Sequence, residues 1–183
     1  MTELSLHILD IVQNSIKAGA DLIEITVTEN IADNLLVISI DDNGCGMEKE
    51  FLKDVVNPFR TTRTTRKVGL GLSLLKNACE LTGGHLEIDS EVGVGTKVKA
   101  TFTHNSIDRQ PLGDMASTMS AIIGGNDTID YIYTHKFNDS SFVFSTAEIR
   151  KVLGEDIELS NLDILNWIES YITEQEDILY GGA

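Results

Sequence analysis

The chain has 183 residues, 42% of them hydrophobic, and carries a net charge of −15 at pH 7. This length allows one sizeable hydrophobic core and an additional segment, because single domains commonly hold about 150 residues. An acidic surface repels phosphate backbones and anionic lipid, so we expect neither duplex nucleic acid nor a membrane as the main partner.

The spacing of apolar residues predicts a helix over residues 3–18. One arc of this helix holds Leu4, Ile8, Ile11, Val12 and Ser15. The opposite arc holds His7, Asp10, Asn14 and Lys17 as a polar stripe along the helix. Taken alone, this stripe is typical of a solvated face.

Two strands are predicted next, over residues 23–28 and 35–40, and their alternation favours an antiparallel hairpin. The second strand leads into the segment DDNGCGM, in which Asp42 precedes Gly44 and Gly46. A carboxylate at the mouth of a glycine turn can accept a hydrogen bond from a ligand amine. The segment lacks the alternating acidic residues and the final glutamate of an EF-hand, which excludes a calcium loop of that type.

A short helix is predicted for residues 48–56, with Phe51 and Val55 facing the core. A basic stretch follows, in which Arg60, Arg63, Arg66 and Lys67 precede Gly69 and Gly71. Glycines let the backbone approach an anion, a helix start offers free N–H groups, and arginines pair with phosphate oxygens. By itself the stretch fits a phosphate site and a disordered basic loop equally well.

The next predicted helix spans residues 70–82, with Leu74, Ala78 and Leu81 on one face. Gly83 and Gly84 are typical of its C-terminal cap. The segments HLEIDS and TKVKATF, on either side of two further glycines, predict a second hairpin. This order of elements predicts an α+β fold with helices on one face of a sheet.

Four segments resemble motifs of the GHKL superfamily of ATP-binding domains, which includes DNA gyrase, the large ATP-dependent heat-shock chaperone, sensor histidine kinases and the mismatch-repair protein MutL. DIVQNSIKAGA resembles its N box and DDNGCGM its first glycine box. PFRTTRTTRKVGLGLSLLK resembles its lid and second glycine box, and GVGTKVKATF its last box. The four occur in the family's order and on the expected elements. The resemblance implies a two-layer α/β sandwich over residues 1–103 that binds ATP and Mg²⁺.

The resemblance also implies roles for single residues. Asn14 matches the asparagine that holds magnesium, and Lys17 matches a phosphate-contacting lysine of histidine kinases. Asp42 matches the carboxylate that selects adenine, Thr96 matches the threonine that supports it, and Gly44 and Gly46 give the purine room. The glycine box that surrounds the phosphates comprises Gly69, Leu70, Gly71 and Leu72. The lid cations are Arg60, Arg63, Arg66 and Lys67.

Two departures from the family pattern bear on catalysis. The acidic position of the N box, a glutamate in gyrase and MutL, is Asp10 here. A carboxylate can orient and deprotonate a water, which implies Asp10 as the catalytic base; the alternative is that Asp10 only supports the magnesium site. The chain also opens directly on the N box, without the strand and helix (about thirty residues) that family members usually have there. No dimerising hairpin with a phosphoaccepting histidine precedes it, so we expect any acceptor to lie on another chain.

Residues 104–183 resemble no family, and they predict a small mixed α/β C-terminal appendage of unknown role. They include an apolar helix over 112–123, an aromatic hairpin over 128–144, and two helices that open at the capping residues Ser145 and Ser160. The last of these helices is expected to bury Leu165, Ile168 and Ile172, with Trp167 as a further candidate. The aromatic strand either extends the nucleotide-binding sheet or meets a partner, and internal packing is its ordinary role.

We therefore expect a magnesium-dependent ATP-binding regulatory protein that hydrolyses ATP slowly and signals to a protein partner. The alternatives are a protein kinase that acts in trans on histidine or serine, and a nucleotide sensor without turnover. The sequence predicts no oligomeric state. The two cysteines lack metal-site spacing, the N-terminus lacks a secretory pattern, and no apolar run reaches membrane-spanning length, which favours the cytoplasm.

Overall fold

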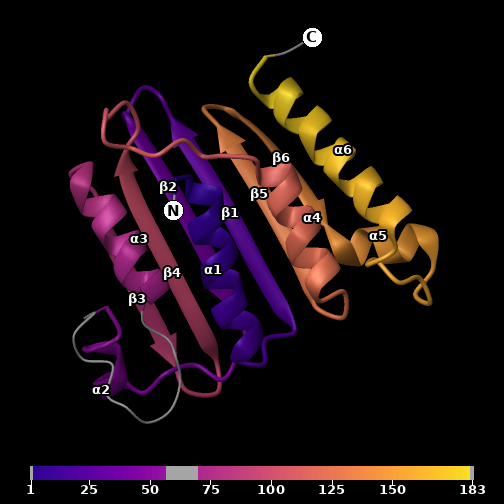
Figure 1. Cartoon of the computed structure of the whole chain (residues 1–183), viewed down its shortest axis with the longest axis horizontal. Coiled ribbons are helices and arrows are strands. Elements are labelled where there is room, and N and C mark those ends of the chain that lie inside the picture. The colour runs from indigo at the N-terminus through magenta and orange to yellow at the C-terminus, as the bar shows by residue number, and fades with distance from the viewer. Residues whose placement is uncertain (1, 57–69, 182–183) are drawn as a thin grey trace.

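The computed structural model describes residues 2–56 and 70–181, which form one sheet covered on one face by helices (Figure 1). In this part of the chain the helices are α1 (Leu4–Lys17), α2 (Lys49–Leu52), α3 (Leu70–Leu81), α4 (Met115–Gly125), α5 (Thr146–Leu153) and α6 (Leu162–Leu179). The strands are β1 (Leu22–Asn30), β2 (Leu35–Asp42), β3 (His85–Glu91), β4 (Gly95–Thr103), β5 (Asp130–Phe137) and β6 (Ser140–Ser145).

The described strands form a six-stranded sheet in the order β3-β4-β2-β1-β5-β6. The predicted hairpins β1–β2, β3–β4 and β5–β6 all pair antiparallel, as their alternating patterns indicated. β5 lies parallel to β1, so the sheet is mixed and the second half of the chain extends it. The predicted α+β fold, a two-layer α/β sandwich, is confirmed.

The core lies between the sheet and the helix layer. Alternate residues of each central strand face inward, which buries Ile23, Ile25 and Val27 of β1 completely. α3, α1, α4 and α6 lie side by side over this face, in that order across Figure 1. The aromatic hairpin packs internally, because Tyr131 and Tyr133 of β5 are fully buried beneath the helices. No helix in residues 2–56 or 70–181 is long and apolar enough to cross a membrane.

Several local predictions are wrong. The predicted helix at 48–56 shrinks to the single turn of α2, and Phe51 is 41% exposed while Val55 is buried. α3 turns a different face toward the core: it buries Leu72, Leu75 and Cys79 and leaves Leu74 and Leu81 exposed.

The capping predictions in the tail are confirmed only in part. Ser145 is the N-cap residue of α5, as predicted, but its side chain makes no cap bond. α6 is capped by Asn161, whose side chain accepts from the Asp163 N–H, while the Ser160 hydroxyl donates to Asp127. The predicted burial of Ile168 and Ile172 in α6 is confirmed, whereas Leu165 is only half-buried and Trp167 is exposed.

Candidate functional site

The polar stripe of α1 is only partly a solvated face. Asp10 and Asn14 are half-buried, and Lys17 is exposed at the end of the helix. His7 is buried, and its Nε2 lies 2.9 Å from Oε1 of Gln110. Burial lowers the pKa of His7. The assignment of His7 to the solvated stripe is therefore wrong.

Asp42 ends β2, and two hydrogen bonds fix its carboxylate. The Ser15 hydroxyl donates to Oδ2 over 2.6 Å, and the Gly44 N–H donates to Oδ1 over 2.9 Å. An ionised carboxylate has about four acceptor positions, so about two stay open here. The carboxylate can therefore accept from a ligand amine while the protein holds it in place.

The glycine turn after Asp42 packs tightly against two other segments. The Cys45 N–H donates to the Ala18 carbonyl, and the Cys45 carbonyl accepts from the Gly93 N–H, each over 2.9 Å. A Cβ on Gly44 would meet the Cβ of Ala18 at 2.9 Å. Gly46 has φ +69°, and a Cβ there would lie 2.0 Å from the Glu91 carbonyl oxygen. Close backbone packing therefore requires glycine at both positions.

Thr96 lies directly opposite Asp42 in the β2–β4 register. Its hydroxyl is 2.8 Å from that of Ser90, which also accepts from the Met47 N–H. Ser15 and Ser90 thus belong to the site, although we predicted a role for neither. A serine on the otherwise apolar arc of α1 was the available signal for Ser15.

The start of α3 approaches α1 closely. A Cβ on Gly71 would lie 1.9 Å from Oδ2 of Asp10, so only glycine leaves room for this carboxylate. Leu70 is exposed and Leu72 is buried beside it. Arg60, Arg63, Arg66, Lys67 and Gly69, the remaining predicted phosphate contacts, lie outside the described residues.

The residues present fit a magnesium nucleotide. Asp42 retains acceptor positions for a purine amine, and Asn14, one turn after Asp10 on α1, can offer an amide oxygen. Magnesium takes oxygen ligands and keeps several waters, so one amide oxygen together with phosphate oxygens matches its needs. The glycine turn lies beside Asp42, and the start of α3 lies beside Asp10 at the other end of these residues.

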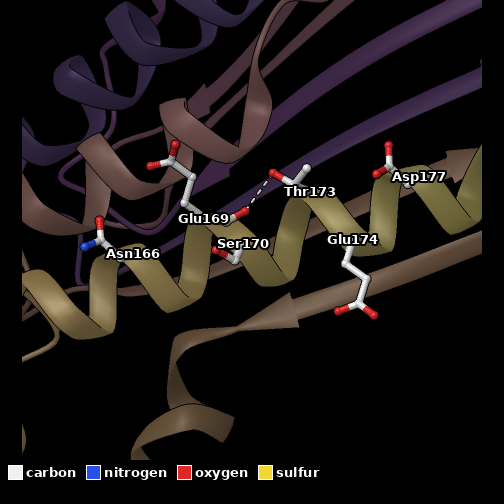
Figure 2. A pocket seen from close by; sticks show the side chains of 6 residues that line it. All are labelled: Asn166, Glu169, Ser170, Thr173, Glu174 and Asp177. Atoms are coloured by element: carbon white, nitrogen blue, oxygen red, sulfur yellow. Dashed lines mark hydrogen bonds between the residues drawn. The ribbon is translucent and has the colours of Figure 1, made fainter.

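A hollow elsewhere on the surface has a different character. Figure 2 shows its polar lining, all on one face of α6: Asn166, Glu169, Ser170, Thr173, Glu174 and Asp177. The Thr173 hydroxyl donates to the Glu169 carbonyl within the helix. Its lining comes from one helix alone, far from Asp42 in the fold.

Known proteins resemble the part of the chain that carries these residues. A family sequence model described as "Histidine kinase-, DNA gyrase B-, and HSP90-like ATPase" matches residues 2–106. Histidine protein kinase DivJ of Caulobacter vibrioides is 34% identical over 95 residues, which cover 50% of this chain and 16% of DivJ. Sporulation kinase D of Bacillus subtilis is 32% identical over 95 residues, covering 52% of this chain and 19% of the kinase. The chain thus spans less than a fifth of each relative.

A solved structure also shares the fold. The crystal structure of the N-terminal domain of a DNA repair protein superposes with a TM-score of 0.53 at 18% identity. The match covers 78% of this chain and 52% of the other. Because 78% extends beyond residues 2–106, part of the C-terminal half also has its counterpart in that fold.

Proposed function

Because this chain belongs to the family of histidine kinase-, DNA gyrase B- and HSP90-like ATPases, we propose that it binds ATP with Mg²⁺ and uses the bound nucleotide to regulate a protein partner. The observation that carries this proposal is the Asp42 carboxylate, held by Ser15 and the Gly44 N–H with acceptor positions to spare. The adenine amino group would occupy one of them.

The phosphates would lie between α1 and the start of α3. Asn14 would bind the magnesium ion, which neutralises phosphate charge when it is bound. The N–H groups of the first turn of α3, at Leu70 and Gly71, favour an anion there. Lys17 and the lid cations Arg60, Arg63, Arg66 and Lys67 would add positive charge, with Gly69 allowing close approach.

Asp10 is the candidate base for slow hydrolysis. Its position against Gly71 supports this role, because the carboxylate then lies at the phosphate end of the proposed nucleotide. It would hold a water and accept its proton as the water attacks. α1 packs against α4, and α4 against α6, which gives the site a packed route to the C-terminal half.

The kinase relatives favour a second candidate function. DivJ and sporulation kinase D are 34% and 32% identical to this chain over about half of its length, which supports transfer of the phosphoryl group to a partner in trans. Asp10 would then activate the partner's acceptor. Binding without turnover would instead make the chain an adenine-nucleotide sensor.

One experiment separates these functions. The purified full chain is incubated with Mg²⁺ and ATP labelled at the γ-phosphate, with and without proteins that co-purify with it. Released phosphate identifies an ATPase, label on a co-purified protein identifies a kinase, and retained ATP alone identifies a sensor. A chain that retains no ATP contradicts the whole proposal.

A further inference from the structure

A cluster of ionisable side chains, centred on the buried His135 and Glu29, joins residues 2–106 to the C-terminal half. It comprises Glu29 of β1, His104 after β4, Tyr133 and His135 of β5, and Glu176 and Tyr180 at the end of α6. His135 is 0% exposed and Glu29 is 7% exposed. Glu29 and His104 belong to the segment 2–106, and the other four belong to the remainder. The cluster therefore crosses the seam between β1 and β5.

Both ring nitrogens of His135 face carboxylate oxygens. Nε2 lies 2.9 Å from Oε1 of Glu29, and Nδ1 lies 3.1 Å from Oε1 of Glu176. An ionised carboxylate only accepts hydrogen bonds, and a neutral imidazole carries one N–H. The Tyr133 and Tyr180 hydroxyls also lie 3.1 Å from Nδ1 and 3.3 Å from Nε2, but each donates its single proton to a carboxylate. The arrangement is therefore that of an imidazolium, which donates from both nitrogens and links β1 to α6.

The neighbouring groups reinforce this arrangement. The Tyr133 hydroxyl donates to Oε1 of Glu176 over 2.8 Å, and the Tyr180 hydroxyl donates to Oε1 of Glu29. His104 Nε2 donates to the other oxygen of Glu29 over 2.8 Å. These donors hold both carboxylates toward His135, and those on Glu29 help to lower its pKa against the effect of burial.

The surroundings contribute little further charge to the ring of His135. β6 presents the uncharged ring of Phe142 to His135. The positive charge of Arg109, which follows β4, opposes the rise in the pKa of the Tyr180 hydroxyl. If His135 loses its proton, one ring nitrogen turns a lone pair toward a carboxylate. Glu29 and Glu176 then have no positive charge between them, and carboxylates without such a partner are unfavourable at a buried site.

The end of α6 is the element that can respond. Its middle is anchored by Ile168 and Ile172, both fully buried. Its last turn buries Leu179, while Ile178 and Tyr180 are largely exposed. Releasing the last turn therefore exposes far less apolar surface than releasing the whole helix.

We propose that protonated His135 is a latch that holds the C-terminal end of α6 against β1 and β5, and that loss of its proton to water frees Glu176 and Tyr180. This proposal stands apart from nucleotide binding. Burial opposes the charge on His135, but the hydrogen bonds from Glu176 and Glu29 outweigh it and raise the pKa of this histidine. Because the pKa is raised in the docked state, the latch is fully closed below about pH 6.5 and opens as the pH rises through the docked-state pKa.

Hydrogen exchange of the full chain tests this proposal. The protection of amides 173–181 is compared with that of β1 amides between pH 6 and pH 9, under conditions where exchange reports the opening equilibrium. Protection at the end of α6 should fall about tenfold for each pH unit between 6.5 and the docked-state pKa, and then level off. Equal relative protection at pH 6 and pH 9 would overturn the latch.

A matched pair of variants on the same helix separates the latch from general loss of charge. Glu176→Gln should reduce the pH-dependent step, because Gln leaves His135 with one carboxylate. Glu174→Gln should keep the wild-type step, since Glu174 lies on the outward face of α6 (Figure 2). Equal effects of the two variants would contradict the proposal. Should either variant fold poorly, ¹⁵N resonances of the wild-type His135 ring still decide it: two protonated nitrogens and a midpoint above pH 6.5 support the latch, and a midpoint below 6.5 overturns it.

Discussion

The hydroxyl of Ser15 lies 2.6 Å from Oδ2 of Asp42 and joins α1 to the end of β2. α1 also carries Asn14, directly before Ser15, and Asp10, one turn before Asn14. One helix therefore holds the carboxylate that we propose selects adenine and supplies the side chains proposed for the phosphate end. The distance between the two ends of the site is fixed by the packing of α1 on the sheet.

Replacing Asp42 with Asn should weaken ATP binding. The variant loses a charged acceptor, which is worth about 1.5–3 kcal/mol, or roughly 10- to 150-fold in Kd. Calorimetric titration with ATP measures the loss. Asp41→Asn is the matched control, because Asp41 pairs with Lys97 instead and should leave Kd unchanged. Equal affinities of the Asp42 variant and the wild type would refute the assignment.

Ser15→Ala should weaken binding of ATP more than binding of inosine triphosphate, which lacks the amino group. Without the Ser15 hydroxyl the carboxylate is less well oriented, at a cost of about 0.5–1.5 kcal/mol, or roughly 2- to 13-fold in Kd. Parallel titrations with the two nucleotides provide the comparison. A uniform loss for both would mean that Ser15 only supports the fold.

Gly71→Ala should impair turnover and lower stability by about 1–3 kcal/mol. Its Cβ would overlap Oδ2 of Asp10, so either Asp10 or the start of α3 must move. Gly125→Ala, at the end of α4, is the control because a Cβ there meets nothing within 4 Å. Urea unfolding and phosphate release are measured for both. Wild-type turnover in Gly71→Ala would separate Asp10 from the chemistry.

Thiol labelling should report occupancy of the site. Burial raises the pKa of Cys79 to about 12, so this thiol should stay unreactive in the folded chain. Cys45 is exposed on the glycine turn and should react, giving one labelled thiol in the native chain and two after denaturation. Saturating MgATP should slow labelling of Cys45, and Cys45→Ser should abolish it. Unchanged rates with MgATP would place the nucleotide away from this turn.

Glu29 should make stability depend on pH on the acid side. Burial opposes its ionisation, but hydrogen bonds from His135, Tyr180 and His104 prevail and lower its pKa to about 2. Since the pKa is lowered, the stabilisation is present above the ordinary value near 4.5 and is lost as the pH falls toward 2. The shift corresponds to about 3 kcal/mol. The wild type should therefore lose up to this much between pH 5 and pH 2.5, while Glu29→Gln loses less in urea unfolding.

A surface carboxylate provides the comparison for this acid limb. Glu87 of β3 is an exposed partner of Lys99 of β4, and Glu87→Gln removes this ion pair. Exposed ion pairs contribute little to stability. The unfolding free energy of this variant should follow the wild-type dependence on pH. If Glu29→Gln and Glu87→Gln give the same curve, the buried cluster contributes nothing to the acid limb.

Local patterns predicted much of this fold because they reflect local physics. Alternation gave all three hairpins, and apolar spacing gave α1, α4 and α6, since each pattern matches the period of one element. Asp42 and the glycine turn were found in the same way, because a carboxylate followed by glycines is contiguous in sequence. Ser15 was missed because its partner lies 27 residues away.

The faces of short helices could not be read from the sequence. α3 has apolar residues on several sides, and the side that turns inward places Gly71 so close to Asp10 that only glycine fits there. His7 was assigned to a solvated face for a similar reason. The segment that carries Gln110 covers it, and no property of α1 itself indicates that cover.

By itself the sequence determined the strands, the main helices and the nucleotide-binding motifs, because hydrophobic period and turn chemistry act between residues close in the chain. Only the tertiary structure decided that β5 lies parallel to β1 and that Glu29, His135 and Glu176 meet. These contacts join residues more than 40 positions apart. Such pairings depend on how whole elements pack, because parallel strands need a long crossover and no local pattern specifies their neighbours.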